Sequence, residues 1–389
     1  MPLILLDPLS HSTSSQSRNK FVETALAYAL TYASAVDHTK IGPASITILA
    51  DTDYYSHRGT PGSSSSDIPS TTDQFLDFYV PLHEAHKTGL GSSAALVTAL
   101  TAAVVAHYAP REVVDMKSTK EKFVMHNLAQ AAHCAAQGKV GSGFDVAAAT
   151  YGSCIYKRFS PSILQGLGEI GSKDFSMRLR SLVEAADPSA KWDTDINKDF
   201  GAIVPSGLRL LMCDVDCGSE TVGMVKKVLS WRNEQPEEAL TLWETLQKGN
   251  EDLAAELNNL ASRPNSTSED YENLRDIILT VRSLIRKMSA KSGVPIEPKA
   301  QTTLIDALSQ LPGVVGGVVP GAGGFDAIAL LVEDKEPVIE KLSQFLQKYR
   351  VDEDASDGVS IRNVRLLDVK QVNWGLKKED SSNYRKWLQ

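Results

Sequence analysis

Residues 87–95 read Lys87-Thr-Gly-Leu-Gly-Ser-Ser-Ala-Ala95, a stretch in which glycines, two hydroxyls and the start of an apolar segment coincide. Gly89 and Gly91 permit backbone torsions and close approaches that a side chain would block. A helix predicted over residues 93–107 would point its first amides into this turn, where they can hold an anion. The simpler alternative is an ordinary glycine turn with a serine cap, because the Gly-Lys-Ser/Thr end of a Walker A motif is absent.

Polar side chains around this turn suit a phosphate and a divalent cation. Ser92 or Ser93 can offer a hydroxyl to a phosphate oxygen or to Mg²⁺. Lys87 would add a positive point charge at the entrance of the turn. The chain has 40 basic and 48 acidic residues and therefore a net charge of −8. An anionic ligand would have to be met by a local cluster of positive charges.

A second glycine segment, Gly138-Lys-Val-Gly-Ser-Gly-Phe-Asp-Val-Ala147, follows a helix predicted over residues 121–137, and Gly138 is placed to end that helix. Asp145 precedes a run of small apolar residues. Its carboxylate is therefore either a helix N-cap or a group held against a reacting hydroxyl, and the residues alone favour the N-cap. Lys139 would keep this acid ionised and could bind a substrate phosphate.

A third glycine segment, Pro320-Gly-Ala-Gly-Gly-Phe-Asp326, joins two predicted strands. Four small residues in a row allow the backbone to lie very close to another surface. The alternative, which the segment by itself favours, is a long and bulged hairpin turn in which Asp326 is a turn residue.

Two histidines share one predicted helix. His126 and His133 are seven residues apart, and Gln130 and Gln137 repeat that spacing, so each pair projects from one face. A metal-binding pair on a helix is usually four residues apart. We therefore expect structural histidines, with His126 or Gln137 at the border of a substrate pocket as the alternative.

Composition limits the class of protein. A chain of 389 residues favours two domains over one, and 42% apolar with 23% charged residues is typical of folded globular chains. The acidic balance argues against a nucleic-acid-coating protein. We find no membrane-spanning segment and no secretory signal. The four cysteines are scattered, which favours reduced thiols and a cytoplasmic protein over a zinc site.

The periodicity of the chain predicts a mixed α and β protein. In the first half we expect a helix over residues 17–35, capped by Ser17, and strands over residues 44–50 and 74–82. The second half is predicted to contain strands at 208–215, 314–319, 326–333 and 364–369, and helices near 219–232, 236–262, 268–290 and 335–349. That order is a split βαβ arrangement with extra helices in the first crossover. A domain junction is expected within residues 161–200.

The three glycine segments together resemble the GHMP kinase superfamily, and their amino-acid sequences are most similar to those of the fungal phosphomevalonate kinases. The phrases Pro205-Ser-Gly-Leu and Gly218-Ser-Glu-Thr221 extend the resemblance, which runs from about residue 17 to residue 378. It implies an α+β fold of two domains. Residues 1–200 would form a ribosomal-S5-like N-terminal domain, truncated at its start, and residues 201–389 a ferredoxin-like domain with inserted helices.

The resemblance also implies an activity, the transfer of the ATP γ-phosphoryl group to (R)-5-phosphomevalonate in the mevalonate pathway of isoprenoid and sterol synthesis. Asp145 and Lys87 would act in catalysis, and Ser93 would help to hold Mg²⁺. The ATP phosphates would contact Gly89, Leu90, Gly91, Ser92, Ser93 and Ala94. The acceptor would contact Lys87, Lys139, Ser142, Gly321, Ala322, Gly323 and Gly324.

One departure from the family pattern keeps alternatives open. Members begin with a strand and turn that carry a Pro-Gly-Lys motif and a Gly-Gly-Tyr-like segment, and residues 1–16 match neither. We therefore expect the N-terminal motif region to be missing. The alternatives are a truncated, non-catalytic GHMP fold, or a GHMP enzyme with another substrate, such as mevalonate, homoserine or diphosphomevalonate. A monomer or a homodimer is expected.

Overall fold

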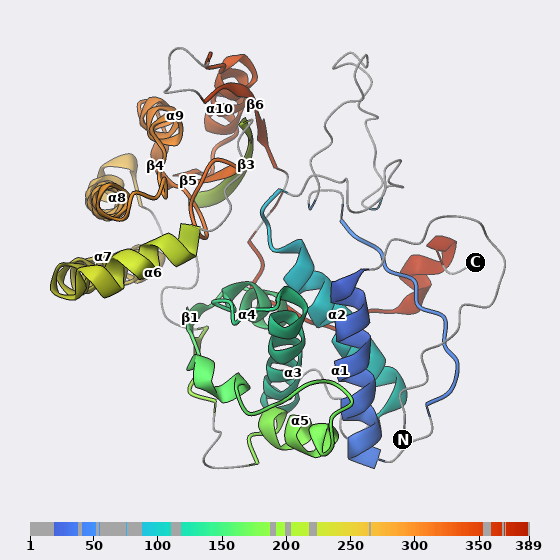
Figure 1. The fold of residues 1–389 in the computed structure, drawn as a ribbon. Helices are drawn as coiled ribbons and strands as arrows, with labels where there is room; N and C mark the ends of the chain where they lie inside the picture. The colour runs from blue at the N-terminus through green and yellow to red at the C-terminus, as the bar shows by residue number, and fades with distance from the viewer. Residues whose placement is uncertain are drawn as a thin grey trace.

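The computed structural model describes most of the chain in two groups of elements (Figure 1). The described residues are 19–37, 41–51, 54, 75, 88–109, 118–186, 192–198, 204–217, 224–263, 266–352, 359–367, 369 and 371–387. Figure 1 shows helices α1 to α5 in one group and a sheet with helices α6 to α10 in the other. Within the described residues no helix has the length and apolar character needed to cross a membrane.

The first group is a cluster of helices with a common core. Its members are α1 (Lys20–Asp37), α2 (Ser92–Tyr108), α3 (Thr119–Gln137), α4 (Phe144–Tyr151) and α5 (Phe175–Val183). The predicted stripe of α1 is confirmed, because Ala25, Tyr28 and Tyr32 are buried against the other helices. The predicted cap, Ser17, lies outside the described residues. Asn19 caps this helix, since its Oδ1 accepts from the amides of Phe21 and Val22.

Helix α3 lies at the centre of this group and is buried along most of its length. It ends where the sequence predicts. Gly138 has a φ of 69°, and its amide donates to the carbonyls of Cys134 and Ala135. The left-handed conformation costs glycine little, so this residue both ends the helix and turns the chain toward the second glycine segment.

The strand predicted over residues 44–50 is wrong. These residues form no strand, and Ile46 and Ile48 are each 47% exposed. Their β-branched composition is suited to a sheet, but a strand also needs a neighbour to pair with. Of the strand predicted over residues 74–82, only Phe75 lies within the described residues.

A small antiparallel pair completes the first half. Strand β1 (Ile155–Lys157) pairs with β2 (Asp195–Asn197), and η3 (Pro161–Leu164) follows β1. Residues 161–200, where we expected a domain junction, thus carry α5 and β2. The indole of Trp192 donates to the carbonyl of Leu182 and is buried in the helical core.

The second half contains a four-stranded antiparallel sheet. Its strands are β3 (Leu208–Cys217), β4 (Val314–Val318), β5 (Ala327–Glu333) and β6 (Ile361–Leu366), in the order β4-β5-β3-β6. Strand β5 is buried at every position because it lies between two neighbours and has a core on each face. This strand order is that of the predicted ferredoxin-like fold.

Helices connect the strands as the split βαβ pattern requires. The first crossover contains α6 (Met224–Glu234), α7 (Pro236–Ala261), η5 (Ser268–Tyr271), α8 (Glu272–Ser292) and α9 (Lys299–Ser309), and the second contains α10 (Glu336–Lys348). Four of these helices, α6, α7, α8 and α10, confirm predicted segments with shifts of a few residues at their ends. Helix α9 was missed; it begins directly after Pro298 and packs Leu304, Ile305 and Leu308 against the sheet.

The chain returns to the first half after β6. The amide of Ser153 donates to the carbonyl of Val372, and the amide of Leu376 donates to the carbonyl of Thr150. Gly375 allows this approach, since a Cβ there would lie 2.5 Å from the carbonyl carbon of Thr150. A further 3-10 helix, η7 (Ser381–Trp387), follows. The domain limits 1–200 and 201–389 stay a prediction.

Candidate functional site

The first glycine segment forms an uncapped helix N-terminus. Gly91 is the N-cap of α2 and adopts a left-handed conformation, with a φ of 73° and a ψ of 32°. Its carbonyl accepts from the amides of Ala94 and Ala95, and no side chain caps this terminus. Within the described residues, the amides of Ser92 and Ser93 at the start of α2 therefore remain available to an anion, which the helix dipole would also stabilise.

The residues next to this terminus differ in how far they are exposed. Ala94 is buried in the helical core, and its amide donates to the Gly91 carbonyl. Gly89 has a φ of 75°, and a Cβ placed on it would meet no atom of the described residues within 4 Å. Leu90, Ser92 and Ser93 are partly exposed. Lys87 lies outside the described residues.

The second glycine segment has the same construction. Gly143 is the N-cap of α4 with a φ of 83°, and again no side chain caps the helix. Asp145 stands in the first turn of α4, where its Oδ1 accepts from the amide of Val146 at 2.9 Å. The N-cap interpretation of Asp145 is therefore wrong, because Gly143 occupies the N-cap position.

The two helix N-termini meet. A Cβ placed on Gly91 would lie 3.3 Å from the Cβ of Asp145, closer than nine in ten real contacts of that kind. The absence of a side chain at Gly91 thus allows the carboxylate-bearing turn of α4 to approach the amide-bearing turn of α2. Because a phosphate held at α2 would lie beside a carboxylate, the pair suits a phosphate–cation complex better than a bare anion.

His133 joins the two segments, and the sequence analysis missed this role. Its Nε2 lies 3.1 Å from the Oγ of Ser93 and 3.4 Å from the Nε2 of Gln137. Burial lowers the pKa of His133 below its ordinary value, while the nearby charge of Asp145 acts in the opposite direction. A neutral His133 with an unprotonated Nε2 can accept from the Ser93 hydroxyl and hold it in place.

The other histidine is structural. His126 is buried among the rings of Tyr151, Tyr156 and Trp192, and its Nδ1 lies 3.2 Å from the Oδ1 of Asn127. Burial lowers its pKa to about 4. From the sequence we expected both histidines to be structural. The two differ in position along α3. His133 lies in the last turns of the helix, one turn before Gln137 and close to the second glycine segment, whereas His126 lies nearer the middle of the helix.

Side chains from and after β1 hold the loop that carries Lys139 and Ser142. The Tyr156 hydroxyl donates to the carbonyl of Ser142 at 2.9 Å, and Arg158 donates to the carbonyl of Val140 at 2.9 Å. Lys139 and Ser142 are exposed. A Cβ on Gly143 would lie 2.3 Å from the Gln130 Oε1, so this position also requires glycine. The loop therefore presents two polar side chains on a fixed backbone.

The third glycine segment belongs to the sheet of the second half, where it connects β4 to β5. Gly321, Gly323 and Gly324 all have positive φ values, and Ala322 is exposed between them. The amide of Gly324 donates to the carbonyl of Ile296 at 2.9 Å. Among the described residues, no hydrogen bond connects this turn to Ser93 or Asp145. The structure thus brings together the first and second segments, but not the third.

The residues at α2 and α4 fit Mg²⁺ bound together with a nucleotide. Mg²⁺ prefers oxygen ligands and is commonly held by one or two carboxylates with substrate phosphates. The Asp145 carboxylate and the hydroxyls of Ser92 and Ser93 supply oxygen at this corner. The described residues contain no group of three or more acidic, histidine or cysteine side chains that could hold a metal ion by themselves. A Mg²⁺ ion held here would share phosphate oxygens and water with these side chains.

Comparisons with known proteins give the family of the chain. The family model of the GHMP kinases N-terminal domain matches residues 26–153, and that of the GHMP kinases C-terminal domain matches residues 270–351. A crystal structure of the Lin0012 protein from Listeria innocua superposes with a TM-score of 0.56 at 18% identity, covering 92% of this chain and 83% of that one. This similarity establishes the fold alone.

Sequence relatives are much closer. The phosphomevalonate kinase of Aspergillus fumigatus is 53% identical over 373 residues, which are 95% of this chain and 76% of that protein. The phosphomevalonate kinase of Gibberella zeae is 48% identical over 375 residues, which are 95% of this chain and 78% of that protein. The chain therefore belongs to the GHMP kinases and, within them, to the phosphomevalonate kinase family.

Proposed function

We propose that this chain transfers the γ-phosphoryl group of ATP to (R)-5-phosphomevalonate, giving (R)-5-diphosphomevalonate and ADP. The observation that carries the proposal is the contact between Gly91 and Asp145, where a Cβ on the glycine would lie 3.3 Å from the Cβ of the aspartate. It places a carboxylate beside an uncapped helix N-terminus. The family of the chain supplies the identity of the acceptor.

The phosphates of ATP would lie at the start of α2. The six residues from Gly89 to Ala94 would surround them with backbone amides and two hydroxyls, and the Ser93 hydroxyl, held by His133, would face the cation. Amides at a helix N-terminus stabilise phosphate without needing a positively charged side chain. An acidic chain can in this way bind a polyanion.

The transfer is an in-line displacement. An oxygen of the acceptor phosphate attacks the γ-phosphorus, a new P–O bond forms, and the bond between the γ-phosphorus and the bridging oxygen of the β-phosphate breaks. The electron pair of that bond leaves with ADP. Positioning and charge neutralisation account for most of the rate in such reactions. Mg²⁺, when bound, would neutralise charge on the β- and γ-phosphates.

The acceptor phosphate leaves Asp145 with little need to remove a proton from it. The second pKa of a phosphate ester is about 6, so the acceptor is largely ionised at neutral pH. The carboxylate is fixed by the Val146 amide in the first turn of α4 and lies beside Gly91. We assign it to holding the cation and orienting the acceptor, rather than to obligatory base catalysis.

Cationic and hydroxyl side chains would receive the acceptor. Lys139 and Ser142 are exposed on the loop before α4, and Lys87 precedes the first glycine segment. The turn of Gly321, Ala322, Gly323 and Gly324 would close on the phosphates from the second half. We also expect the chain to act in the cytoplasm, as a monomer or a homodimer.

The test is acceptor-dependent ADP release by the purified chain with Mg·ATP. Phosphomevalonate, mevalonate and buffer alone are compared at equal protein concentration. We expect ADP to form only with phosphomevalonate. ADP release with mevalonate alone would assign another acceptor, and the absence of release with either would favour a non-catalytic GHMP fold.

A further inference from the structure

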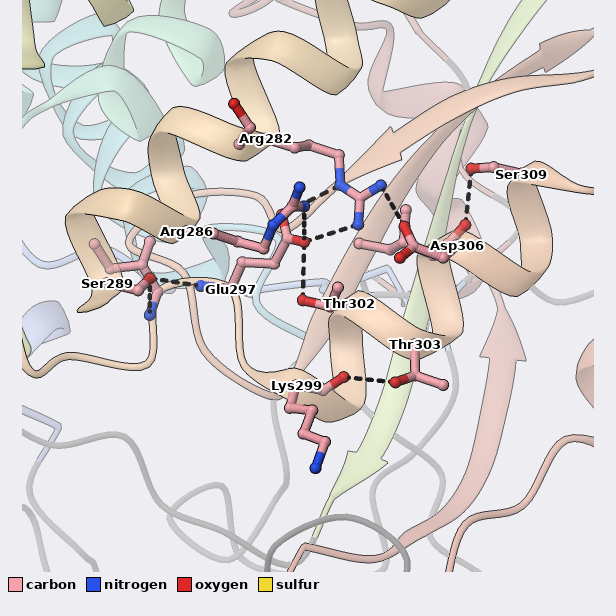
Figure 2. A network of polar contacts seen from close by, with 12 residues as sticks. Arg282, Arg286, Ser289, Glu297, Lys299, Thr302, Thr303, Asp306 and Ser309 are labelled. Carbon is pink, nitrogen blue, oxygen red and sulfur yellow. Dashed lines mark hydrogen bonds and ion pairs between the residues drawn. The ribbon is translucent and has the colours of Figure 1, made fainter.

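A buried carboxylate in the second half is held from three sides. Glu297 is 1% exposed at its side chain and receives two hydrogen bonds from Arg282, which is equally buried. Arg286 donates to the Glu297 Oε1 at 2.9 Å, and the Thr302 hydroxyl donates to the same atom at 3.0 Å (Figure 2). The carboxylate therefore joins α8 to the beginning of α9.

The residue before Glu297, Ile296, is held by α8 and by the connection itself, where its amide also donates to the carbonyl of Val294 at 2.8 Å. The Oγ of Ser289 accepts from the amides of Ile296 and Glu297, at 3.2 and 3.4 Å (Figure 2). Gly293 ends α8 with a φ of 63°, which turns the chain back toward Ser289. The short connection between α8 and α9 is thus anchored by its backbone amides and by the side chain of Glu297.

This connection shapes the third glycine segment. The carbonyl of Ile296 accepts from the amide of Gly324 at 2.9 Å, and a Cβ on Gly323 would lie 2.3 Å from that carbonyl oxygen. Gln301 of α9 also donates to the carbonyl of Phe325 at 2.5 Å. The glycine turn therefore takes its shape from Ile296, directly next to the buried carboxylate.

We propose that Glu297 is a positioning residue for phosphoryl transfer, because it fixes Ile296 and through it the turn of Gly321 to Gly324. The proposal rests on the proposed function, in which this turn closes on the phosphates. A buried ion pair is weak evidence of a gain in stability, but a paired and fully hydrogen-bonded carboxylate has one geometry. A turn with three glycines in four residues needs such an external support.

The test uses Glu297→Gln and Ser289→Ala, with Asp306→Asn as the matched control. The Oδ1 of Asp306 accepts from Arg282 at 2.8 Å, but the Asp306 side chain is 56% exposed and lies on α9, after the connection that Glu297 and Ser289 anchor. Ser289→Ala removes the hydroxyl that accepts from the amides of Ile296 and Glu297, so that the Ile296 amide keeps only its bond to the Val294 carbonyl, and it leaves the buried charges paired. If Glu297→Gln fails to fold, Ser289→Ala still tests whether the connection before α9 positions the turn.

Two readouts are taken on each variant. Hydrogen exchange of the amides of residues 321–326 reports the turn itself, and kcat and KM report the reaction. We expect the Gly324 amide to exchange about tenfold faster in both test variants, and kcat to fall at least about fivefold at a nearly constant KM for ATP. In Asp306→Asn both quantities should match the wild type.

Two results would overturn the proposal and remain distinguishable. If the wild type releases ADP with phosphomevalonate but exchange in Ser289→Ala and Glu297→Gln equals that in Asp306→Asn, the positioning role is wrong while the proposed function stands. If the wild type releases no ADP with phosphomevalonate, the proposed function fails, and the catalytic role of Glu297 fails with it.

Discussion

Gly91 and Asp145 face one another across the N-termini of α2 and α4, so closely that a Cβ on the glycine would lie 3.3 Å from the Cβ of the aspartate. Each helix starts from a left-handed glycine with no side-chain cap. The arrangement leaves backbone amides and a carboxylate at one corner of the molecule. Amides suit phosphate and the carboxylate suits its cation, which is the combination that Mg·ATP requires.

The contact itself can be tested by Gly91→Ala. An alanine at a φ of 73° costs about 1–2 kcal/mol of backbone strain, and its Cβ would displace Asp145. We expect kcat to fall by about tenfold or more, since small displacements of reacting groups are costly. The control is Gly171→Ala, which has a φ of 82° with no atom near its Cβ. It should lose similar stability in denaturant unfolding but keep its kcat.

Asp145→Asn tests the carboxylate without changing its size. We expect kcat to fall by about 10²–10³, the range for losing one group that stabilises charge in the transition state, and the melting temperature to change little. A negative charge in the first turn of a helix contributes only about 0.3–1 kcal/mol. A large loss of stability with an unchanged kcat would instead make Asp145 a structural helix-terminal residue.

His126 predicts acid sensitivity of the folded state. Burial lowers the pKa of His126 from 6.5 to about 4, so between these values the unfolded chain binds a proton that the folded chain does not. The free energy of unfolding should therefore fall as the pH is lowered from 6.5 to 4, with a contribution of about 3 kcal/mol from this residue. Urea unfolding at several pH values measures it.

The matched variant for this prediction is His126→Gln, which cannot titrate. It should be less stable than the wild type at pH 7, where the imidazole packs against three aromatic rings. Its stability should depend less steeply on pH between 6.5 and 4. Equal slopes in the two proteins would show that His126 is accessible to protons in the folded state.

Arg282→Met should destabilise the second half strongly. It leaves the Glu297 carboxylate buried with one arginine instead of two, and breaking a buried ion pair typically costs about 3–5 kcal/mol. Lys248→Met removes the exposed pair with Asp252 and serves as the comparison. Chemical denaturation should show a large loss for the first and no measurable change for the second. Similar losses of stability in the two variants would mean that the burial of the Arg282–Glu297 pair does not determine its contribution.

Tyr156→Phe should act on the acceptor. The Tyr156 hydroxyl supports the Ser142 carbonyl, and its loss would loosen the loop that carries Lys139. We expect the KM for phosphomevalonate to rise several-fold with about 1 kcal/mol or less lost in stability. Tyr108→Phe removes a comparable bond, to the carbonyl of Gly42, away from this loop. If both variants show the same KM, the loop does not contribute to acceptor binding.

Periodicity and glycine chemistry predicted much of this fold. The end of α3 at Gly138 follows from a left-handed glycine after an apolar stripe, and the buried pattern of β3 follows from alternating side chains. Local pattern misled us at residues 44–50, where β-branched residues have no pairing partner among the described residues. Helix α9 is short and follows two prolines, which concealed its period.

The site was only partly predictable. The two glycine segments were found, because glycine is required wherever backbone and ligand approach closely. Their mutual contact was not, since it depends on how α2 and α4 pack. His133 could not be distinguished from His126 by spacing, because both lie on the same face of α3 and only the fold brings one of them to Ser93. The Glu297 network likewise joins residues from two helices.

The central claim is that phosphomevalonate accepts the γ-phosphoryl group at this site, and ³¹P NMR of one reaction mixture tests it most directly. The purified chain is incubated with Mg·ATP and phosphomevalonate. The account predicts that the γ-phosphate signal of ATP disappears while signals of ADP and of a new diphosphate ester appear in equal amounts. Unchanged spectra, or the growth of inorganic phosphate without a diphosphate ester, would contradict it.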